Sequence, residues 1–395
     1  MQRVNLSIAQ KESEGQLLPF FIQEALKEGN AVSLWKMPNS NEKHLIICAG
    51  SPLPIEDISL EETATGFIFA PFDNTKNKLF FKGDIIHSFK DGLYEGQPLT
   101  RSEQPKQPPS TSIEKPTTNF HFSKPLPKPD QVNGYIELVQ MSIDEIRKGN
   151  LEKIVPSRFK NIDLVPDFDV VETFNKLCIA YPNTLVSLVS SKESGTWIGA
   201  TPELLVSIDQ QARFKTVALA GTKRLDSAVD IRSVAWTEKE IEEQAMVSRY
   251  IINCFKKIRL REYEEHGPRT AVAGNLLHLR TEYEVDMAAT NFPQLGSVML
   301  KLLHPTSAVC GMPLSNAQDF LKTYEGYDRE FYSGYLGPVN FRNESQVFVN
   351  LRCMQIHQHQ ATLYAGAGVT IDSIPEKEFE ETEMKMDTLQ KILFD

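Results

Sequence analysis

The spacing of apolar residues along the chain predicts a few long helices among many short strands. Apolar positions recur at helical spacing over 135–148 and stop before Gly149, which predicts a helix there. Further helices are predicted over 237–258 and from about Pro375, a residue suited to a first helical turn. Runs rich in β-branched and aromatic residues predict strands over 66–71, 78–82, 153–159, 185–190, 196–198, 203–208, 213–219, 346–355 and 361–365. Because the strands are grouped rather than alternating with helices, we expect an α+β fold with large antiparallel sheets, not a doubly wound nucleotide fold.

One change in composition divides the chain. Residues 101–130 contain seven prolines among Ser, Thr, Lys and Gln, with few aliphatic residues, which is typical of a linker or an extended surface loop. Residues 1–100 show mixed strands and helices without candidate chemistry, so we expect an α+β scaffold there. The candidate chemistry lies in 131–395, and we expect this catalytic region to form one integrated domain with the N-terminal part.

Charge and composition exclude several classes of function. The net charge of −10 argues against nucleic acid as a partner, although a bound cation could still attract a small anionic substrate. The chain has no signal peptide pattern after Met1, and no apolar run approaches the roughly 18 residues of a membrane span. Five scattered cysteines without CxxC spacing indicate a reducing compartment, so we expect a cytoplasmic protein with buried thiols.

Two predicted helices each carry a pair of carboxylates. Glu240 and Glu243 lie three residues apart and therefore on one helix face, and Glu378 and Glu381 repeat this spacing with Lys385 four residues further on. Taken singly, Glu240 could cap its own helix, and Glu381 could form an exposed pair with Lys385. Taken together, the four carboxylates could form an all-oxygen site, which favours magnesium.

Three further elements carry candidate chemistry. Arg352 is expected inside an apolar strand, where its charge needs a substrate carboxylate or a structural ion pair. The turn at 366–368 is either a plain turn or a place where the backbone approaches an anion. Lys153 begins a predicted strand and Glu203 follows a proline turn. A desolvated lysine can act as a base and a protonated glutamate as an acid.

Nine ordered segments between residues 135 and 393 resemble the chorismate-utilising enzymes. This family includes isochorismate, salicylate, anthranilate and aminodeoxychorismate synthases. The segments are KIVPSR, GATPELL, ALAGTKR, KEIEEQAMV, LHPTSAVCGMP, EGYDREFYSG, LRC, YAGAG and SIPEKEFEETEMK. The resemblance implies two layers of large β-sheets flanked by helices, a site in a cleft between them, chorismate as substrate and Mg²⁺ as cofactor.

The resemblance also implies roles for individual residues. Glu243 and Glu381 match the magnesium ligands, while Glu240 and Glu378 match supporting acidic positions. Lys385 matches a cation near the ring carboxylate. The residues that match the enolpyruvyl cradle are Arg352, Tyr332, Gly366, Ala367 and Gly368. Further expected substrate-binding residues are Gly221, Thr222, His278 and Ala308.

Three positions distinguish the branches of the family. Lys153 stands where the amine-transferring members usually carry Gln, and Ala220 stands where aminodeoxychorismate synthases tend to carry Lys. Both positions favour isochorismate or salicylate synthase over a chorismate-binding subunit that needs a glutaminase partner. Ala308, where salicylate-forming relatives tend to carry Thr, favours isochorismate as the product. Ile241 and Gln244 depart from the Arg and His that the family often has in this helix.

The expected reaction assigns opposite tasks to two residues. Lys153 removes a proton from water at C2 of chorismate, and Glu203 protonates the departing C4 hydroxyl, so Lys153 must be tuned toward neutral and Glu203 toward protonated. A non-catalytic protein with a structural metal is a further alternative. The sequence leaves open whether the product enters menaquinone or siderophore synthesis, and we expect a monomer or weak homodimer.

Overall fold

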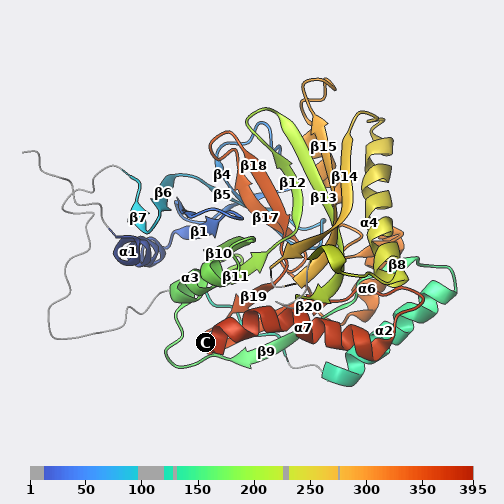
Figure 1. Cartoon of the computed structure of the whole chain (residues 1–395). Helices are drawn as coiled ribbons and strands as arrows, with labels where there is room; N and C mark the ends of the chain where they lie inside the picture. Colours follow the sequence, from blue (N-terminus) through green and yellow to red (C-terminus); the bar gives the residue numbers. More distant parts are fainter. Residues whose placement is uncertain (1–12, 97–119, 128–130, 226–230, 275, 395) are drawn as a thin grey trace, which may run out of the picture.

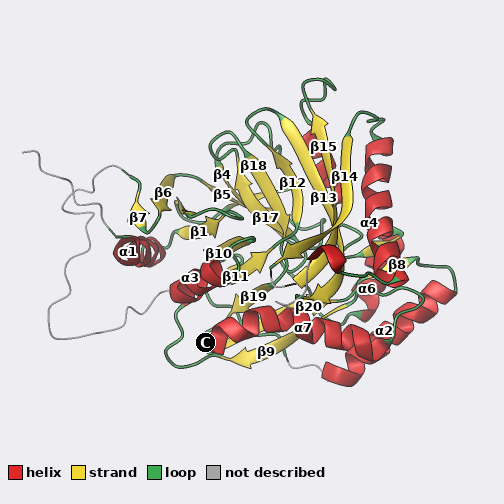
Figure 2. Ribbon diagram, viewed as in Figure 1, coloured by secondary structure: helices red, strands yellow, loops and turns green. Residues whose placement is uncertain are grey.

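Two antiparallel β-sheets packed face to face form the centre of the molecule (Figures 1 and 2). The computed structural model describes residues 13–96, 120–127, 131–225, 231–274 and 276–394. Each of the two sheets has nine strands, and helices flank them. The α+β fold predicted from the grouping of strands is therefore confirmed.

The first sheet contains strands from both ends of the chain. Its strands, from one edge to the other, are β7 (Leu93–Tyr94), β6 (Ile85–Lys90), β2 (Glu42–Cys48), β1 (Ala31–Lys36), β10 (Leu185–Ser191), β11 (Gly195–Thr201), β19 (Cys353–Ile356), β20 (Gln360–Gly366) and β9 (Ser157–Asp163). The contact between the N-terminal strands and the rest is the β1–β10 ladder, in which Leu34 pairs with Leu188. Residues of the first hundred thus occupy one half of this sheet.

The second sheet is assembled in the same way. Its strands in order are β14 (Glu264–Ala273), β15 (Leu276–Asp286), β13 (Arg213–Arg224), β12 (Leu204–Ile208), β18 (Ser345–Val349), β17 (Tyr335–Val339), β4 (Gly66–Ala70), β5 (Lys78–Lys82) and β3 (Leu53–Ile55). A separate two-stranded ladder joins β8 (Lys153–Ile154) to β16 (Gly311–Met312). The described helices are α1 (Glu14–Lys27), α2 (Gln131–Arg147), α3 (Val170–Ala180), α4 (Glu238–Lys257), α5 (Leu295–Leu303), α6 (Leu314–Tyr324) and α7 (Pro375–Phe394), with a short 3₁₀ turn at Ile231–Ser233.

The hydrophobic core is divided among the layers. Aromatic residues fill the space between the sheets, where Trp197 of the first sheet packs edge-on against Phe69 of the second at 6.2 Å between ring centroids. Helices α1, α3 and α7 cover the outer face of the first sheet, and α4 and α5 cover that of the second. Helices α2 and α6 pack together around β8. Burial of apolar area on both faces of each sheet stabilises this arrangement of layers.

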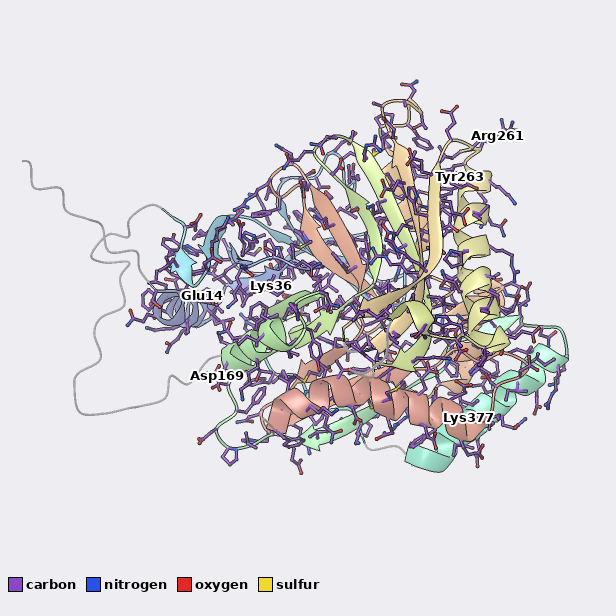
Figure 3. The ribbon with its side chains drawn as sticks, viewed as in Figure 1. Glu14, Lys36, Asp169, Arg261, Tyr263 and Lys377 are labelled. Atoms are coloured by element: carbon purple, nitrogen blue, oxygen red, sulfur yellow. The ribbon has the colours of Figure 1, made fainter. Side chains whose placement is uncertain are left out.

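Local sequence signals explain where the helices begin. Asp169, labelled in Figure 3, precedes α3, and its Oδ1 accepts a hydrogen bond of 2.7 Å from the backbone N–H of Glu172. Helix α4 begins with a capping box, in which the Glu240 carboxylate accepts from the backbone N–H of Thr237 at 2.7 Å. Helix α2 begins at Gln131 rather than at the predicted residue 135.

Two predicted strands are each divided in the structure. The predicted strand 153–159 breaks at Pro156, which has no N–H to donate to a ladder, so β8 and β9 pair with different strands. The predicted strand 346–355 is also wrong, because β18 belongs to the second sheet and β19 to the first. Arg352 lies between them with a φ of +47°. The expectation that Arg352 sits inside an apolar strand is therefore corrected: it lies at a crossing between sheets.

Other predictions concern the surface and the linker. Of the proline-rich segment 101–130, only residues 120–127 are among those described. All five cysteines are buried and free, as expected for apolar thiols. Among the helices described, none combines the length and apolar character that crossing a bilayer requires.

Candidate active site

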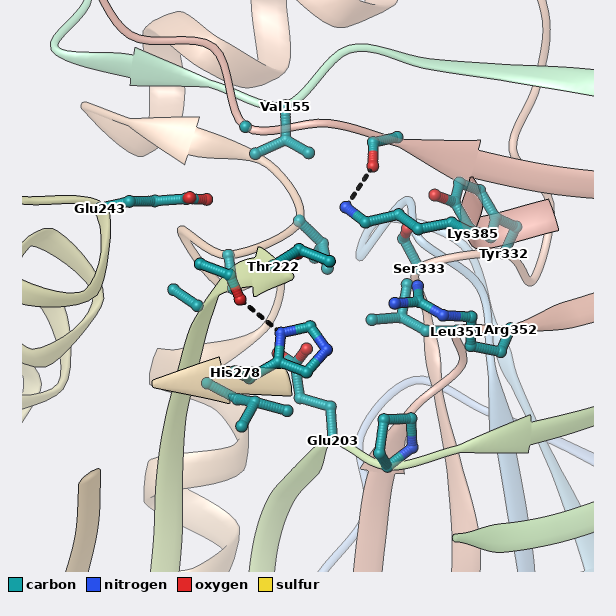
Figure 4. A pocket seen from close by; sticks show the side chains of 18 residues that line it. Val155, Glu203, Thr222, Glu243, His278, Tyr332, Ser333, Leu351, Arg352 and Lys385 are labelled. Atoms are coloured by element: carbon teal, nitrogen blue, oxygen red, sulfur yellow. Dashed lines mark hydrogen bonds between the residues drawn. The ribbon is translucent and has the colours of Figure 1, made fainter. Parts of the chain in front are cut away.

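A pocket opens where the chain passes from one sheet to the other (Figure 4). The connection from β11 to β12 carries Glu203, and the connection from β18 to β19 carries Arg352. Strands β13 and β15, helices α4 and α7, and the loops before β16 and β17 complete the wall. Among the described residues, none that lines the pocket comes from the first hundred of the chain.

The structure brings most of the predicted residues together. The predicted residues that line the pocket are Glu203, Gly221, Thr222, Glu243, His278, Ala308, Tyr332, Arg352, Gly366, Gly368 and Lys385. The predicted residues that do not line it are Lys153, Glu240, Ala367, Glu378 and Glu381. Lys153 nevertheless lies directly behind the wall, because its Nζ donates to Glu243 Oε1 at 3.0 Å. Lys153 itself is fully buried.

Arg352 is a cation of the pocket that has no anionic partner among the residues that the structure describes. Among the described residues, its guanidinium makes no hydrogen bond and has no carboxylate within ion-pair distance. Burial lowers the pKa of Arg352, against the opposing effect of Tyr332. A partly buried guanidinium without a counter-ion is costly, so this group is prepared to receive an anion from outside the protein.

Glu203 and His278 project into the same pocket from the second sheet and its edge (Figure 4). Burial raises the pKa of Glu203 to about 7, although Arg352 and Lys153 pull it down. Burial lowers the pKa of His278 to about 3, so the ring is neutral near pH 7. His278 Nδ1 lies 2.6 Å from the carbonyl oxygen of Gly221 and must donate to it, which leaves Nε2 as an acceptor. That Nε2 is buried and has no partner among the described residues.

Carboxylates that are paired with lysines lie at and behind the opposite wall, of which Glu243 and Lys385 line the pocket. Lys239 Nζ lies 2.5 Å from Glu378 Oε1, and Lys385 Nζ lies 2.7 Å from Glu381 Oε1 and 2.8 Å from the Gly366 carbonyl oxygen. Burial opposes ionisation of Glu243, but Lys153 outweighs it, with the other two lysines assisting, and keeps its pKa below the ordinary value.

Glu378 has one unsatisfied oxygen. Its side chain is only 1% exposed, and among the described residues its Oε2 lacks any hydrogen-bond partner. Burial raises the pKa of Glu378 against the attraction of Lys239, and the charge of Glu381 adds to the rise.

These carboxylates fit a hard divalent cation only in part. Among the described residues, no group of three or more metal-ligating side chains is already gathered around one point. Mg²⁺, however, commonly uses one or two carboxylates and keeps several waters. Glu243 and Glu381 would supply such a pair, and the unsatisfied Glu378 Oε2 is an orphaned acceptor on the helix of Glu381. The residues present therefore fit Mg²⁺, provided that lysines release the oxygens that they now hold.

Glu240 does not fit this set. Its Oε2 accepts from both the backbone N–H and the hydroxyl of Thr237, so the carboxylate serves its own helix start. Helix α4 places Glu240 beside Gly221, whose φ of +69° favours glycine, and not in the pocket. A supporting metal position at Glu240 stays a prediction, and the contacts seen are those of a helix cap.

The 366–368 turn reaches the pocket through Gly366 and Gly368, which pack closely against neighbouring groups. The Ala367 N–H donates to the Pro156 carbonyl oxygen at 3.3 Å, so it is not available to an anion. A Cβ on Gly368 would lie 2.3 Å from Glu243 Oε1. Glycine at 368 is thus required by the close approach of the Glu243 carboxylate.

Comparisons with known proteins identify the family. The model of the family described as chorismate binding enzyme matches residues 88–394. The chain belongs to this family. The resemblance carried by the nine sequence segments is therefore confirmed.

Several members of this family resemble the chain. Isochorismate synthase EntC of Escherichia coli K12 is 28% identical over 248 residues, which cover 61% of this chain and 62% of EntC, less than two thirds of its length. Isochorismate synthase DhbC of Bacillus subtilis is 29% identical over 286 residues, covering 69% of this chain and 70% of DhbC. The solved structure of MenF, the menaquinone-specific isochorismate synthase of Escherichia coli, matches with a TM-score of 0.71 at 19% identity, covering 94% of this chain and 90% of MenF. This last likeness confirms the layered fold.

Gln244 and Ile241 replace the His and Arg that the family often has in α4, and both fit the structure of this helix. Gln244 is buried, and its Nε2 donates to the Ala218 carbonyl oxygen at 3.2 Å and to Thr281 Oγ1 at 3.1 Å. Helix α4 is thus held to both β13 and β15. Ile241 is 53% exposed and takes no part in the pocket wall.

Apolar parts of the wall were missed by sequence reasoning. The pocket is also lined by Val155, Pro202, Leu219, Val309, Ser333 and Leu351. Nothing in the sequence distinguishes these residues from ordinary core residues. The only hint is that they lie next to predicted site residues along the chain. Ala220, used to separate branches of the family, does line the pocket.

Proposed function

We propose that the protein is an isochorismate synthase, which converts chorismate into isochorismate. The observation that carries this proposal is the guanidinium of Arg352, which has no anionic partner among the described residues and shares a pocket with Glu203. With the pKa of Glu203 raised to about 7, the same pocket contains a group able to donate a proton near neutral pH. Chorismate offers both an anionic carboxylate and a hydroxyl that must be protonated before it leaves.

Arg352 and Tyr332 would bind the enolpyruvyl carboxylate. The fork of the guanidinium matches a carboxylate with two parallel hydrogen bonds. Tyr332 is buried, and burial raises its pKa to about 12, so its hydroxyl stays protonated as a donor. Gly366 and Gly368 keep this wall free of side chains, and Lys385 adds a second positive charge.

Glu243, Glu381 and the free oxygen of Glu378 are the groups that would hold Mg²⁺. When bound, the ion would orient the ring carboxylate of the substrate and neutralise its charge. Lys239 and Lys385, which now contact Glu378 and Glu381, keep these carboxylates compensated in its absence.

The chemical step would use Lys153 and Glu203. Lys153 accepts a proton from a water molecule whose oxygen bonds to C2 of the ring. The double bonds shift, and the C4 hydroxyl leaves as water with the proton of Glu203. One water is consumed and one released, so the substrate is isomerised, and solvent returns the proton from Lys153 to Glu203.

Lys153 cannot act as a base in the arrangement seen. Its Nζ donates a hydrogen bond to Glu243 Oε1 at 3.0 Å, so the amine is engaged as a donor. Lys153 would accept a proton only in a state in which this contact is broken. Lys153 and a bound cation would compete for the Glu243 carboxylate. This competition would link the proposed base to the proposed metal site.

His278 is proposed to position a hydroxyl. Its neutral ring directs the unpartnered acceptor Nε2 into the interior of the site. Such an acceptor suits either the protonated carboxyl of Glu203 or a hydroxyl of the substrate.

Product analysis tests this proposal. The purified chain is incubated with chorismate, with and without Mg²⁺, and the products are separated by chromatography. We expect isochorismate as the product, only with Mg²⁺, and without need for ammonium. Lys153→Ala is expected to lower kcat by about 10³-fold. Lys148→Ala, which removes a surface partner of Glu145, is the control and should leave kcat unchanged.

Other products would favour the alternatives. Salicylate together with pyruvate would assign the chain to salicylate synthases, against the small Ala308 in the wall. An aminated product formed only with ammonium would indicate a subunit that depends on a glutaminase. Wild-type turnover by Lys153→Ala would contradict the role of the lysine.

A further inference from the structure

We propose that Arg329 is a positioning residue for the chemical step, because it fixes the spacing between two walls of the pocket. The inference rests on the proposed function. Arg329 lies in the loop between α6 and β17 and does not line the pocket. Its side chain is 2% exposed, and its contacts point toward the two segments that carry Val155 and Val309.

The guanidinium of Arg329 donates to both wall segments at once. Nη1 donates to the Val309 carbonyl oxygen at 2.8 Å, and Nη2 donates to the Val155 carbonyl oxygen at 2.7 Å. Val155 lies two residues after Lys153, and Val309 follows Ala308, so each bonded residue belongs to a pocket wall. One planar group therefore sets the distance between the lysine segment and the opposing loop.

Glu325 holds the guanidinium in this orientation. Arg329 Nε donates to Glu325 Oε2 at 2.7 Å, and Nη2 donates to Oε1 at 2.6 Å. Glu325 Oε1 also accepts from the backbone N–H and the hydroxyl of Ser157, each at 2.7 Å. The face of the guanidinium packs over the ring of Phe72, 4.3 Å from its centroid. All these contacts converge on a charge that is excluded from water.

The same unit reaches the substrate cradle. The Arg329 carbonyl oxygen accepts from the backbone N–H of Tyr332 at 2.9 Å, and Tyr332 lines the pocket. The Val155 N–H donates to the Cys310 carbonyl oxygen at 2.8 Å, so both backbone polar groups of Val155 are held. A shift of Arg329 would move the Lys153 segment, the Val309 loop and Tyr332 relative to one another.

Arg329→Lys is the deciding variant. Lysine keeps the positive charge beside Glu325, but a single ammonium cannot span two carboxylate oxygens and two carbonyl oxygens. Because an error of about 1 Å in catalytic geometry can cost about 100-fold, we expect kcat per folded molecule to fall about 100-fold, with KM for chorismate changed less than threefold. Arg342→Lys is the matched control, since Arg342 also pairs with a glutamate and packs on a phenylalanine, but at the surface.

Amide hydrogen exchange gives a readout that does not depend on turnover. In Arg329→Lys we expect faster exchange in 153–157 and 306–310 and unchanged exchange in α1 and α3. This measurement needs no substrate, so it tests the inference even where the wild-type chain fails to convert chorismate. Failure of the proposed function would show in the wild-type product assay, whereas failure of the inference would show in the variant alone.

Two results would overturn the inference. One is a kcat within threefold of wild type for folded Arg329→Lys, and the other is faster exchange spread evenly over the molecule. Where Arg329→Lys does not fold, Ser157→Ala decides instead, because it removes one donor to Glu325 and leaves the ion pair. We then expect kcat to fall about fivefold, and an unchanged kcat would reject the role of this cluster.

Discussion

The two sides of the pocket differ in how their charges are compensated. On the carboxylate side, Glu243, Glu378 and Glu381 each contact a lysine. On the arginine side, the Arg352 guanidinium and the His278 Nε2 have no hydrogen-bond partner among the described residues. The carboxylate side has its charges compensated by lysines, although Glu378 Oε2 has no hydrogen-bond partner among the described residues, and its ion pairs must rearrange to accept a cation. The arginine side is incomplete without a ligand and is satisfied by one.

This difference separates stability from function. Removing one member of a buried ion pair leaves an uncompensated charge and destabilises the fold, whereas removing an unpaired charge relieves a desolvation cost. Substitutions on the carboxylate side should therefore lower stability. Substitutions on the arginine side should impair activity and leave the fold intact.

Arg352→Met should have the largest effect on activity and almost none on stability. We expect kcat/KM for chorismate to fall by about 10²- to 10³-fold, because a charge-assisted pair with the substrate carboxylate is lost. The free energy of unfolding should stay equal to wild type or rise by up to about 1 kcal/mol. Steady-state kinetics and urea denaturation measure the two quantities. A variant that is destabilised by more than about 1 kcal/mol would show that Arg352 has a structural partner after all.

Lys239→Met should give the opposite result. Glu378 is only 1% exposed, so loss of its lysine leaves a buried carboxylate uncompensated. Because Lys239 itself is 29% exposed, we expect a loss of about 2–3 kcal/mol in unfolding free energy at pH 8, below the full cost of a broken buried pair. The loss should shrink at lower pH, since burial already raises the pKa of Glu378 and protonation removes the charge.

A second substitution provides the control for Lys239→Met. Adding Glu378→Gln should restore most of the lost stability, because no charge then remains to be compensated. Lys148→Met, at an exposed pair with Glu145, should change stability by less than about 0.5 kcal/mol. Equal losses at both lysines would remove the distinction between the carboxylate side and the surface.

The pH dependence of Glu203 gives the smallest effect. Burial raises its folded-state pKa from 4.5 to about 7, so the native state keeps a proton that the unfolded chain releases. The stabilisation from this proton is complete below about pH 4.5 and is lost as the pH rises through about 7. We expect kcat to fall about tenfold per pH unit above 7 as the acid is lost.

Glu203→Gln tests the sign of this dependence. The variant cannot ionise at 203, so the difference in unfolding free energy between wild type and variant should become less favourable to wild type between pH 5 and pH 7.5. Denaturation at several pH values measures this difference. A wild type that gains stability relative to the variant over this range would show that Glu203 is ionised in the native state.

Sequence reasoning found the chemistry of the pocket better than its geometry. Arg352 stands out because a charge among apolar neighbours requires a partner, and Glu243 stands out because it shares a helix face with Glu240. Glu203 was assigned only through the resemblance to the family. Their grouping depends on two crossings between sheets, which no local pattern reveals. The run 346–355 has continuous strand character, yet the chain changes sheets inside it at a residue with positive φ.

Residues that act through other residues were harder to predict. Glu325 and Arg329 lie four apart, which on its own indicates an ordinary surface pair. Only the structure shows that the pair is buried and that its free donors reach Val155 and Val309. For Glu240, by contrast, the sequence itself indicated a helix-capping role, and the structure shows the capping hydrogen bond.

The placement of the N-terminal strands has a consequence for synthesis on the ribosome. One edge of β1 has no partner until β10 has been synthesised, and one edge of β4 has none until β17 (Tyr335–Val339) has emerged. Until then the nascent chain presents open strand edges with large apolar side chains, which invite wrong pairing. The pocket can form only when nearly all of its strands have been made, so the yield of active protein depends on keeping these edges from wrong pairing until then.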